Sequence, residues 1–189
     1  MKAAVILAAG ASRRLGRPKQ DVVLGGETLL ERTVRIAIQA ALDPVYVIVA
    51  PERQSSHIPG VTILTNPDAA EGMAASIRTG VLAAAHNQCE GIIILACDQP
   101  AVTPEHLHAI IANSDGGTRI SASNYGSRRG VPAYFPSSAF PGLLELRGDI
   151  GARDLLASAH AILLANGELD IDTAEELARA QILFQTCEG

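Results

Sequence analysis

The sequence predicts an α/β fold, a three-layer arrangement in which a mostly parallel sheet has helices on both faces. Short, fully apolar runs alternate along the chain with longer amphipathic stretches, as expected for buried strands covered by helices. Aromatic residues are only 3% of the 189 residues and Trp is absent, whereas the AVILMFWYC class reaches 48%. Val, Ile, Leu and Ala must therefore build the core, and this mixture is typical of such sheets.

The first half of the chain contains the clearest elements. Residues 3–9 are continuously apolar and predict a buried first strand. Residues 29–42 predict a helix, because their apolar side chains share one face and Thr28 with Glu31 forms a capping box. The same reasoning predicts further strands and helices, with strands at 45–50, 61–65 and 92–97 and helices at 73–85 and 104–113.

The second half of the chain alternates less regularly. Residues 124–149 carry several Gly and Pro residues, and we expect this excursion to add a strand or two and to help shape a substrate site. No linker or repeat interrupts the chain, so residues 1–189 are predicted to form a single domain. The other expected elements are weaker strands at 119–123 and 131–135, a helix at 151–159, a strand at 161–165 and a helix at 173–184.

Charge and cysteine content argue against several classes of protein. A net charge of -5 disfavours a general nucleic-acid binder, which requires a basic face. The three Cys residues lack a CxxC spacing, which disfavours a disulfide framework and a zinc site. The first apolar run is far shorter than the ~18 residues of a membrane span and is a poor signal peptide. We therefore expect a cytoplasmic protein without a membrane partner.

A cluster of cations follows the first predicted strand. Arg13, Arg14, Arg17 and Lys19 fall within seven positions, in a loop rich in small residues at the strand's carboxyl end. Small residues let backbone N–H groups approach an anion, and open sheets bind ligands at this edge. The loop matches neither the dinucleotide fingerprint nor the Walker A pattern, because its two glycines are six positions apart and Gln20 follows the lysine. It is either a phosphate cradle of another type or a solvated basic loop.

The pattern L-A-A-G-x-S-x-R-x-G-x-x-K after an N-terminal strand resembles the signature loop of nucleotidyltransferases built on a Rossmann-like sheet. Within them it is most similar to the molybdenum cofactor cytidylyltransferases and their guanylyltransferase relatives, the MobA-like NTP transferases. The resemblance extends over essentially the whole chain and implies a three-layer sheet of the nucleotidyltransferase type. It also implies a set of nucleotide-binding loop residues, which are Leu7, Ala8, Ala9, Gly10, Ser12, Arg14 and Lys19.

Further segments resemble the substrate sites of this family. A strand-to-helix segment beside the base and ribose in the family matches Asn66, Gly72 and Ser76 here. Gly72 can bring backbone close to a ligand and a helix N-terminus offers free N–H donors, although a plain helix start is the alternative. Residues 129–135 and 146–153 resemble the acceptor-side segments, whose arginines suit phosphate geometry but could equally be surface residues. The candidates for acceptor binding are Arg128, Arg129 and Arg153.

Two aspartates are candidates for holding a metal. Asp98 directly follows the apolar run at 92–97 and matches the metal-binding aspartate of the family. A carboxylate at the carboxyl end of a strand is well placed to hold Mg²⁺ together with a triphosphate. In related transferases an Asp before Thr supplies a second metal ligand, which corresponds to Asp172 here. Asp172 or Thr173 could instead cap the last helix.

The resemblance implies Mg²⁺-dependent transfer of a nucleoside monophosphate. A phosphate monoester is already an anion near neutral pH, so it needs no strong base, and the sequence offers no evident base or nucleophile arrangement. Positioning and charge neutralisation would supply the catalysis, with Lys19, Asp98 and Arg13 as the catalytic residues. Ala9 stands where the guanylyl enzymes carry an extra glycine and favours CTP. The implied acceptor is molybdenum-loaded molybdopterin, with pyrophosphate as the second product.

Other functions stay open at this point. The chain could be a guanylyltransferase that uses GTP, or a cytidylyltransferase that acts on another phosphorylated small molecule. It could also be a non-catalytic nucleotide-binding partner of a molybdoenzyme, and such an enzyme is its expected client. A nicotinamide-dependent dehydrogenase is disfavoured, because the dinucleotide fingerprint is missing.

Overall fold

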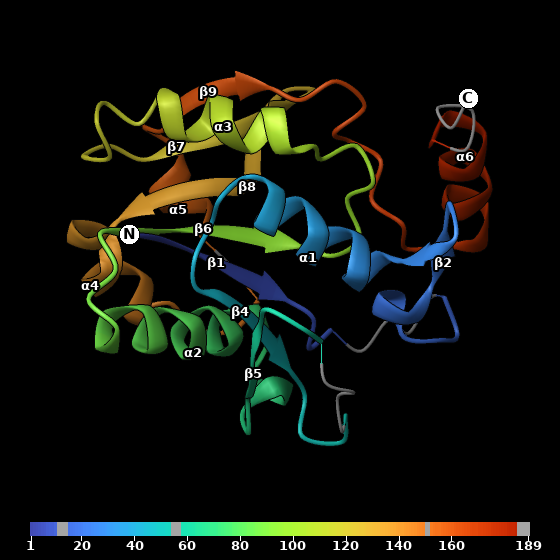
Figure 1. Cartoon of the computed structure of the whole chain (residues 1–189), viewed down its shortest axis with the longest axis horizontal. Coiled ribbons are helices and arrows are strands. Elements are labelled where there is room, and N and C mark those ends of the chain that lie inside the picture. Colours follow the sequence, from blue (N-terminus) through green and yellow to red (C-terminus); the bar gives the residue numbers. More distant parts are fainter. Residues whose placement is uncertain (11–14, 54–57, 150–151, 185–189) are drawn as a thin grey trace.

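A seven-stranded sheet forms the middle of the protein (Figure 1). The computed structural model describes residues 1–10, 15–53, 58–149 and 152–184. The strand order is β5-β4-β1-β6-β8-β7-β9. β1 (Lys2–Leu7) lies between β4 (Val45–Val49) and β6 (Gly91–Ala96) and is parallel to both, and β5 (Thr62–Thr65) extends this half in parallel. The carboxyl ends of these four strands therefore meet at one edge.

The other half of the sheet contains one reversed strand. β8 (Arg128–Pro136) is antiparallel to β6 on one side and to β7 (Ser121–Tyr125) on the other. β9 (His160–Leu163) then pairs in parallel with β7. The predicted mostly parallel sheet is thus confirmed, and the irregular segment at 124–149 contains the hairpin between β7 and β8.

Helices cover both faces of the sheet. Alternate residues of β1 point to opposite faces, so Ala4 and Ile6 enter one core and Ala3 and Val5 enter the other. The first core receives side chains from α1 (Leu29–Gln39) and α3 (Pro104–Ala112). The second core receives side chains from three helices, α2 (Met73–His86), α4 (Phe140–Leu144) and α5 (Arg153–Leu156). This division confirms the three-layer prediction.

A third cluster lies at the end of the molecule toward which β1 points (Figure 1). It joins α6 (Ala174–Phe184) to a short hairpin of β2 (Val23–Leu24) and β3 (Glu27–Thr28). Its buried side chains include Leu24 and Leu177. The cluster brings the last helix beside the carboxyl edge of the sheet, where the first loop also begins.

Local capping explains where two of the helices start. The predicted capping box of α1 is confirmed, because Thr28 Oγ1 accepts from the Glu31 N–H over 3.1 Å and Glu31 Oε2 accepts from the Thr28 N–H over 2.8 Å. Thr103 Oγ1 accepts from the His106 N–H over 3.3 Å, with Pro104 at the first helical position as predicted.

The structure differs from the sequence prediction in several short elements. The helix expected at 151–159 is only α5, because Ala159 is buried in the second core and β9 begins immediately after it. The β2–β3 hairpin was not predicted, since two-residue strands leave no periodic pattern. Three single turns, also unpredicted, are η1 (Lys19–Asp21), η2 (Ala69–Glu71) and η3 (Ser137–Ala139). Among the residues that are described, no helix has the length and apolar content to cross a bilayer.

Candidate active site

The loop after β1 starts from a buried and fixed backbone. Ala8 is 1% exposed, and its N–H donates to the Ile48 carbonyl of β4 over 2.9 Å. From the other side, the side-chain amide of Gln20 donates to the Ala8 carbonyl over 3.1 Å. Gln20 is itself buried on η1, so it ties the start of the loop to the turn that carries Lys19. Sequence reasoning missed this role, because a lone Gln forms no recognisable pattern.

The predicted loop residues become more open along the chain. Leu7 ends β1 and is partly buried, as is Ala9, whereas Gly10 is exposed. Among the described residues, no heavy atom lies within 4 Å of a Cβ built on Gly10, and nucleotide binding by its backbone stays a prediction. The remaining loop candidates lie outside the described residues and stay predictions, namely Ser12, Arg13 and Arg14.

Lys19 lies between two carboxylates from distant parts of the chain. Its Nζ donates to Asp98 Oδ2 over 2.8 Å and also to Asp172 Oδ1. The side chains of Lys19, Asp98 and Asp172 are 21%, 19% and 19% exposed. Burial works to lower the pKa of Lys19, but the charges and hydrogen bonds of the two aspartates outweigh burial and hold this pKa above its ordinary value. Lys19 is therefore a full cation at neutral pH.

Backbone contacts fix the positions of both carboxylates. The Asp98 carbonyl accepts from the Ile171 N–H over 2.9 Å, which brings the chain before α6 beside the end of β6. Thr173 Oγ1 accepts from the Glu176 N–H over 3.2 Å, and Glu176 Oε2 accepts from the Asp172 N–H over 2.9 Å. Thr173 is thus the cap of α6, while the Asp172 carboxylate faces the lysine. Thr173 rather than Asp172 therefore caps the helix, and metal binding by Asp172 stays a prediction.

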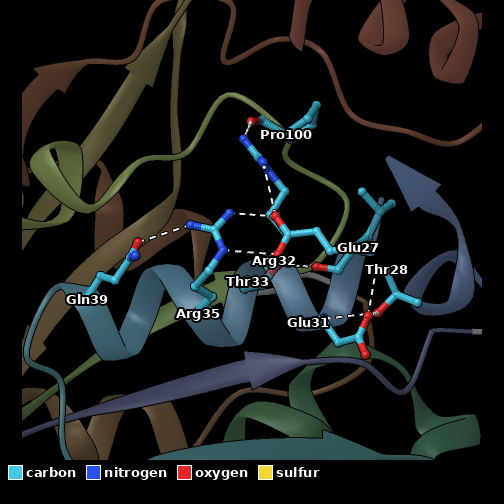
Figure 2. Close-up of polar contacts among 9 residues, drawn as sticks. Glu27, Thr28, Glu31, Arg32, Thr33, Arg35, Gln39 and Pro100 are labelled. Atoms are coloured by element: carbon cyan, nitrogen blue, oxygen red, sulfur yellow. Dashed lines mark hydrogen bonds and ion pairs between the residues drawn. The ribbon is translucent and has the colours of Figure 1, made fainter. Parts of the chain in front are cut away.

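The segment after Asp98 is also tied to α1 (Figure 2). Arg32 Nη2 donates to the Pro100 carbonyl over 3.2 Å, and its Nη1 donates to Glu27 Oε1 over 3.3 Å. Arg35 Nε donates to the other oxygen of Glu27 over 3.0 Å. Hydrogen bonds from Arg35, with the charges of both arginines, hold the pKa of Glu27 below its ordinary value despite partial burial. Glu27 therefore stays ionised and keeps Arg32 on the loop that follows Asp98.

A third carboxylate, Asp170, lies next to this cluster. Burial, and then the nearby charge of Asp98, raise the pKa of Asp170 to about 6. The nearby Gln99 amide lowers the pKa of Asp170 and that of Tyr125 against the effect of burial. Asp170 Oδ1 and Gln99 Oε1 are buried and have no hydrogen-bond partner among the described residues. The sequence analysis did not single out Asp170, although the Asp-Ile-Asp spacing puts it two residues before Asp172.

The cluster suits a hard divalent cation. Asp98 and Asp172 already converge on a cationic group, and carboxylate oxygens are the ligands that Mg²⁺ prefers. Cys97 is not suited, because burial, with the charge of Asp98, raises the pKa of its thiol to about 12 and keeps it protonated. Within the described ranges, no three His, Cys, Asp or Glu side chains gather to hold a metal. The two aspartates would therefore need further oxygens from water or from a phosphate substrate.

Asn66 and Ser76 are buried and bond to each other. Asn66 Nδ2 donates to Ser76 Oγ over 3.0 Å, and its Oδ1 accepts from the Asp68 N–H over 3.0 Å. Asn66 is 1% exposed and Ser76 is 5% exposed. These side chains brace the turn between β5 and α2, and their contact with a nucleotide stays a prediction.

The start of α2 is closed by the chain itself. The Met73 N–H donates to Asp149 Oδ1 over 3.2 Å, and the Ala74 N–H donates to the Gly148 carbonyl over 3.0 Å. Gly72 has φ +120°, and a Cβ there would lie 2.4 Å from Asp149 Oδ1 and 2.8 Å from the Gly148 carbonyl. The first two N–H groups of α2 are therefore not free as expected of a helix N-terminus, because Asp149 and Gly148 accept from them, and nucleotide binding by Gly72 stays a prediction.

Arg78 strengthens this contact between α2 and the segment at 146–149. Its Nη1 donates to the Leu146 carbonyl over 2.7 Å and to Glu71 Oε1 over 3.0 Å. Hydrogen bonds from Arg78 lower the pKa of Glu71, and a further one from the Gly148 backbone adds to the effect. The turn before α2 is thus bound to the segment predicted to serve the acceptor.

The three arginines predicted for the acceptor have different settings. The Arg128 guanidinium lies 5.5 Å from the centre of the Tyr125 ring, and its charge lowers the pKa of Asp170. Arg129 Nη1 donates to the Ala157 carbonyl over 2.7 Å. Arg153 is exposed at the start of α5. Arg128 therefore lies near enough to Asp170 for its charge to act there, and acceptor binding by all three arginines stays a prediction.

Comparison with known proteins identifies the family of this chain. The family model for the MobA-like NTP transferase domain matches residues 4–162. The purine catabolism protein PucB of Bacillus subtilis is 36% identical over 190 residues, which cover 91% of this chain and 92% of PucB. Nicotine blue oxidoreductase of Paenarthrobacter nicotinovorans is 29% identical over 93% of this chain and 94% of its own. A probable molybdenum cofactor guanylyltransferase of Opitutus terrae is 35% identical, but over 53% of this chain and 49% of its own.

Solved structures resemble the whole fold. Rv0371c of Mycobacterium tuberculosis superposes with a TM-score of 0.80 at 29% identity, covering 96% of this chain and 98% of its own. A complex of Rv0371c with manganese superposes with a TM-score of 0.74 at 26% identity, covering 96% and 97%. A nucleotidyl transferase from Methanothermobacter reaches a TM-score of 0.82 at 25% identity, covering 98% of both chains.

Proposed function

Because the chain belongs to the MobA-like NTP transferase family, we propose that it transfers CMP from CTP to the terminal phosphate of molybdenum-loaded molybdopterin and releases pyrophosphate. The observation that carries the proposal is the cluster of Lys19, Asp98 and Asp172 at the carboxyl edge of the sheet. Two anions must meet in this reaction, so the site has to supply positive charge and orientation rather than a base. A charged lysine, together with a divalent ion held by the two carboxylates, would meet that need.

The reaction balances without a proton transfer to the protein. An oxygen of the acceptor phosphate forms a bond to the α-phosphorus of the nucleotide, and the bond from that phosphorus to the bridging oxygen of the β-phosphate breaks. The electron pair leaves on pyrophosphate. Lys19, with Arg13, would stabilise the charge that develops on the departing phosphates. Arg128 is the first candidate among the acceptor-binding arginines, because its charge acts on Asp170 next to the cluster.

Asp98 and Asp172 would hold the metal. When bound, Mg²⁺ would neutralise charge on the triphosphate and help to fix the α-phosphate for attack. The described manganese complex of Rv0371c supports a divalent ion in proteins of this fold. The backbone bonds of Asp98 and Asp172 described above would hold their carboxylates in place before the ion arrives.

The choice of CTP depends on the loop after β1. Ala9 is the third residue of Leu-Ala-Ala-Gly, where guanylyl enzymes carry an extra glycine, and a larger residue beside the base would crowd a purine. GTP is the second candidate, because the relative from Opitutus terrae is named a guanylyltransferase. Two further alternatives are open. A cytidylyltransferase that acts on another phosphorylated acceptor would have the same nucleotide site. A non-catalytic partner of a molybdoenzyme would bind the nucleotide without turning it over.

Thermal unfolding with each of the four ribonucleoside triphosphates, with and without Mg²⁺, tests the nucleotide site. A ligand at about 100 times its dissociation constant stabilises the fold by about 2.7 kcal/mol, which raises the midpoint by roughly 5–10 °C in a chain of this size. We expect the largest magnesium-dependent shift with CTP. A selective shift with GTP would replace CTP in the proposal. NADH is added as a fifth ligand, and a shift with NADH alone would instead support a nicotinamide-dependent dehydrogenase.

Pyrophosphate release with molybdenum-loaded molybdopterin tests the reaction itself. Asp98→Ala should abolish metal-dependent turnover, and Lys19→Ala should lower kcat by about 10²–10³-fold. Lys2→Ala is the matched control, because Lys2 begins β1 at the opposite edge of the sheet. Near wild-type turnover in both Asp98→Ala and Lys19→Ala would refute the proposed function.

A further inference from the structure

Lys19 takes the place toward which both candidate metal ligands point. Its ammonium group bonds to Asp98 and to Asp172, and the three side chains are mostly withdrawn from solvent. We propose that Lys19 is a resident cation that a divalent metal must displace, so that metal binding and nucleotide binding are coupled through this one side chain. This inference rests on the proposed function, because it assumes that the displaced lysine moves to the phosphates of a nucleotide.

Charge balance supports displacement. The side chains of Lys19, Asp98 and Asp172 together carry two negative charges and one positive charge, and each is about one-fifth exposed to solvent. A divalent ion added beside the ammonium would place three positive charges against two negative ones, and like charges at such distances repel strongly. Lysine has a flexible four-carbon stem and a compact charged group, so Lys19 can leave the carboxylates without moving η1. The ammonium group then needs a new anionic partner.

The coordination number of the metal indicates that the nucleotide is the new anionic partner of Lys19. Mg²⁺ and Mn²⁺ demand about six oxygen ligands and are commonly bound by one or two carboxylates together with substrate phosphates. Asp98 and Asp172 supply two carboxylates, and the described residues contain no larger acidic or histidine group. A triphosphate would complete the metal's ligands and would also accept the charge of Lys19. Each ligand therefore favours the other, and the coupling is reciprocal.

The carboxylates should stay in place when the lysine is removed. The bonds from the Ile171 N–H to the Asp98 carbonyl and from the Asp172 N–H to Glu176 do not involve Lys19. Lys19→Met should thus leave two aspartates in position without their cation. Removal of the Lys19 ammonium group would then tighten metal binding in the absence of nucleotide. A lysine that only contacted phosphate would not have this effect.

The first measurement is Mn²⁺ binding without nucleotide, followed by electron paramagnetic resonance. We expect Lys19→Met and Lys19→Gln to lower the dissociation constant for Mn²⁺ by about ten-fold. Two controls remove a cation elsewhere. Lys2→Met removes the only other lysine, and Arg53→Gln removes a cation that pairs with Asp21 beside η1. Both controls should stay within about two-fold of the wild type, because neither cation lies between the carboxylates.

Two further arms complete the test. Asp172→Asn added to Lys19→Met should abolish the gain in Mn²⁺ affinity, which assigns the gain to this cluster. Saturating CTP should tighten Mn²⁺ binding to the wild type by about ten-fold or more, and the factor should shrink in Lys19→Met. Mn²⁺ binding by Lys19→Met that is equal to or weaker than that of the wild type, without nucleotide, would overturn the inference. If Lys19→Met does not fold, the same comparison is made with Lys19→Gln. Failure of CTP to bind the wild type would instead count against the proposed function, and the nucleotide-free comparison would remain valid.

Discussion

Gly72→Ala tests whether the segment at 146–149 holds the start of α2 in place. A Cβ at this position would lie 2.4 Å from Asp149 Oδ1 and 2.8 Å from the Gly148 carbonyl carbon and oxygen. Non-glycine residues held at such a φ are strained by about 1–3 kcal/mol. Relieving the overlap would also separate Gly148 and Asp149 from the helix, which costs about 1 kcal/mol for each of two hydrogen bonds. The expected loss is about 3–5 kcal/mol of unfolding free energy.

Urea unfolding of paired variants isolates the contact. Gly116→Ala is the matched control, because Gly116 also has a positive φ but a Cβ there would meet nothing within 4 Å. The control should lose only about 1–2 kcal/mol from backbone strain. Asp149→Ala in the Gly72→Ala background should recover little stability, since the overlap with the Gly148 backbone remains. If Gly72→Ala lost no more stability than Gly116→Ala, the close approach of the two segments would be refuted.

Two further substitutions test the groups next to the cluster. Because burial and the charge of Asp98 raise the pKa of Asp170 to about 6, the folded state is favoured with Asp170 protonated, and this contribution is lost as pH rises from about 4 through 6. Urea unfolding in EDTA gives the difference in unfolding free energy between Asp170→Asn and the wild type. After allowance for solvent screening, this difference should move in favour of Asp170→Asn by about 1 kcal/mol between pH 4.5 and pH 8. An unchanged difference would contradict the raised pKa. Thr173→Ala should cost about 1 kcal/mol, through loss of the cap that accepts from the Glu176 N–H, and should weaken Mn²⁺ binding, whereas Thr173→Ser should retain both. An equal effect of Ala and Ser would rule out the cap.

The long elements and the site's location could be predicted because each has a local cause. Apolar runs gave β1, β4 and β6, and the capping box of Thr28 and Glu31 gave the start of α1. Lys19 and Asp98 each follow a parallel strand, and parallel strands end at one edge of a sheet, so their proximity follows from the topology. The sequence could not show that the lysine would lie between the two carboxylates, because that depends on distances set by the whole fold.

What the sequence missed has non-local causes. The cap of α2 comes from Asp149, far along the chain, and no spacing rule connects an aspartate with a helix 76 residues before it. The role of Gln20 depends on its burial against the Ala8 carbonyl, which appears only when the loop has folded back. Likewise, Asp170 differs from Asp172 by its surroundings rather than by residue type. The pattern of residues therefore could not show which individual polar side chains become buried.

The central position of β1 has a consequence for synthesis of the chain. β1 is made first, yet its neighbours in the sheet are β4 and β6, and β6 ends at Ala96. At about 5–20 residues per second, a ribosome needs roughly 5–20 s to deliver both neighbours after β1 emerges. During this interval Val5 and Ile6, which are fully buried in the finished protein, lack at least one of their two neighbouring strands. The nascent chain therefore exposes an apolar strand for seconds, and a chaperone that binds short extended apolar peptides would meet it there.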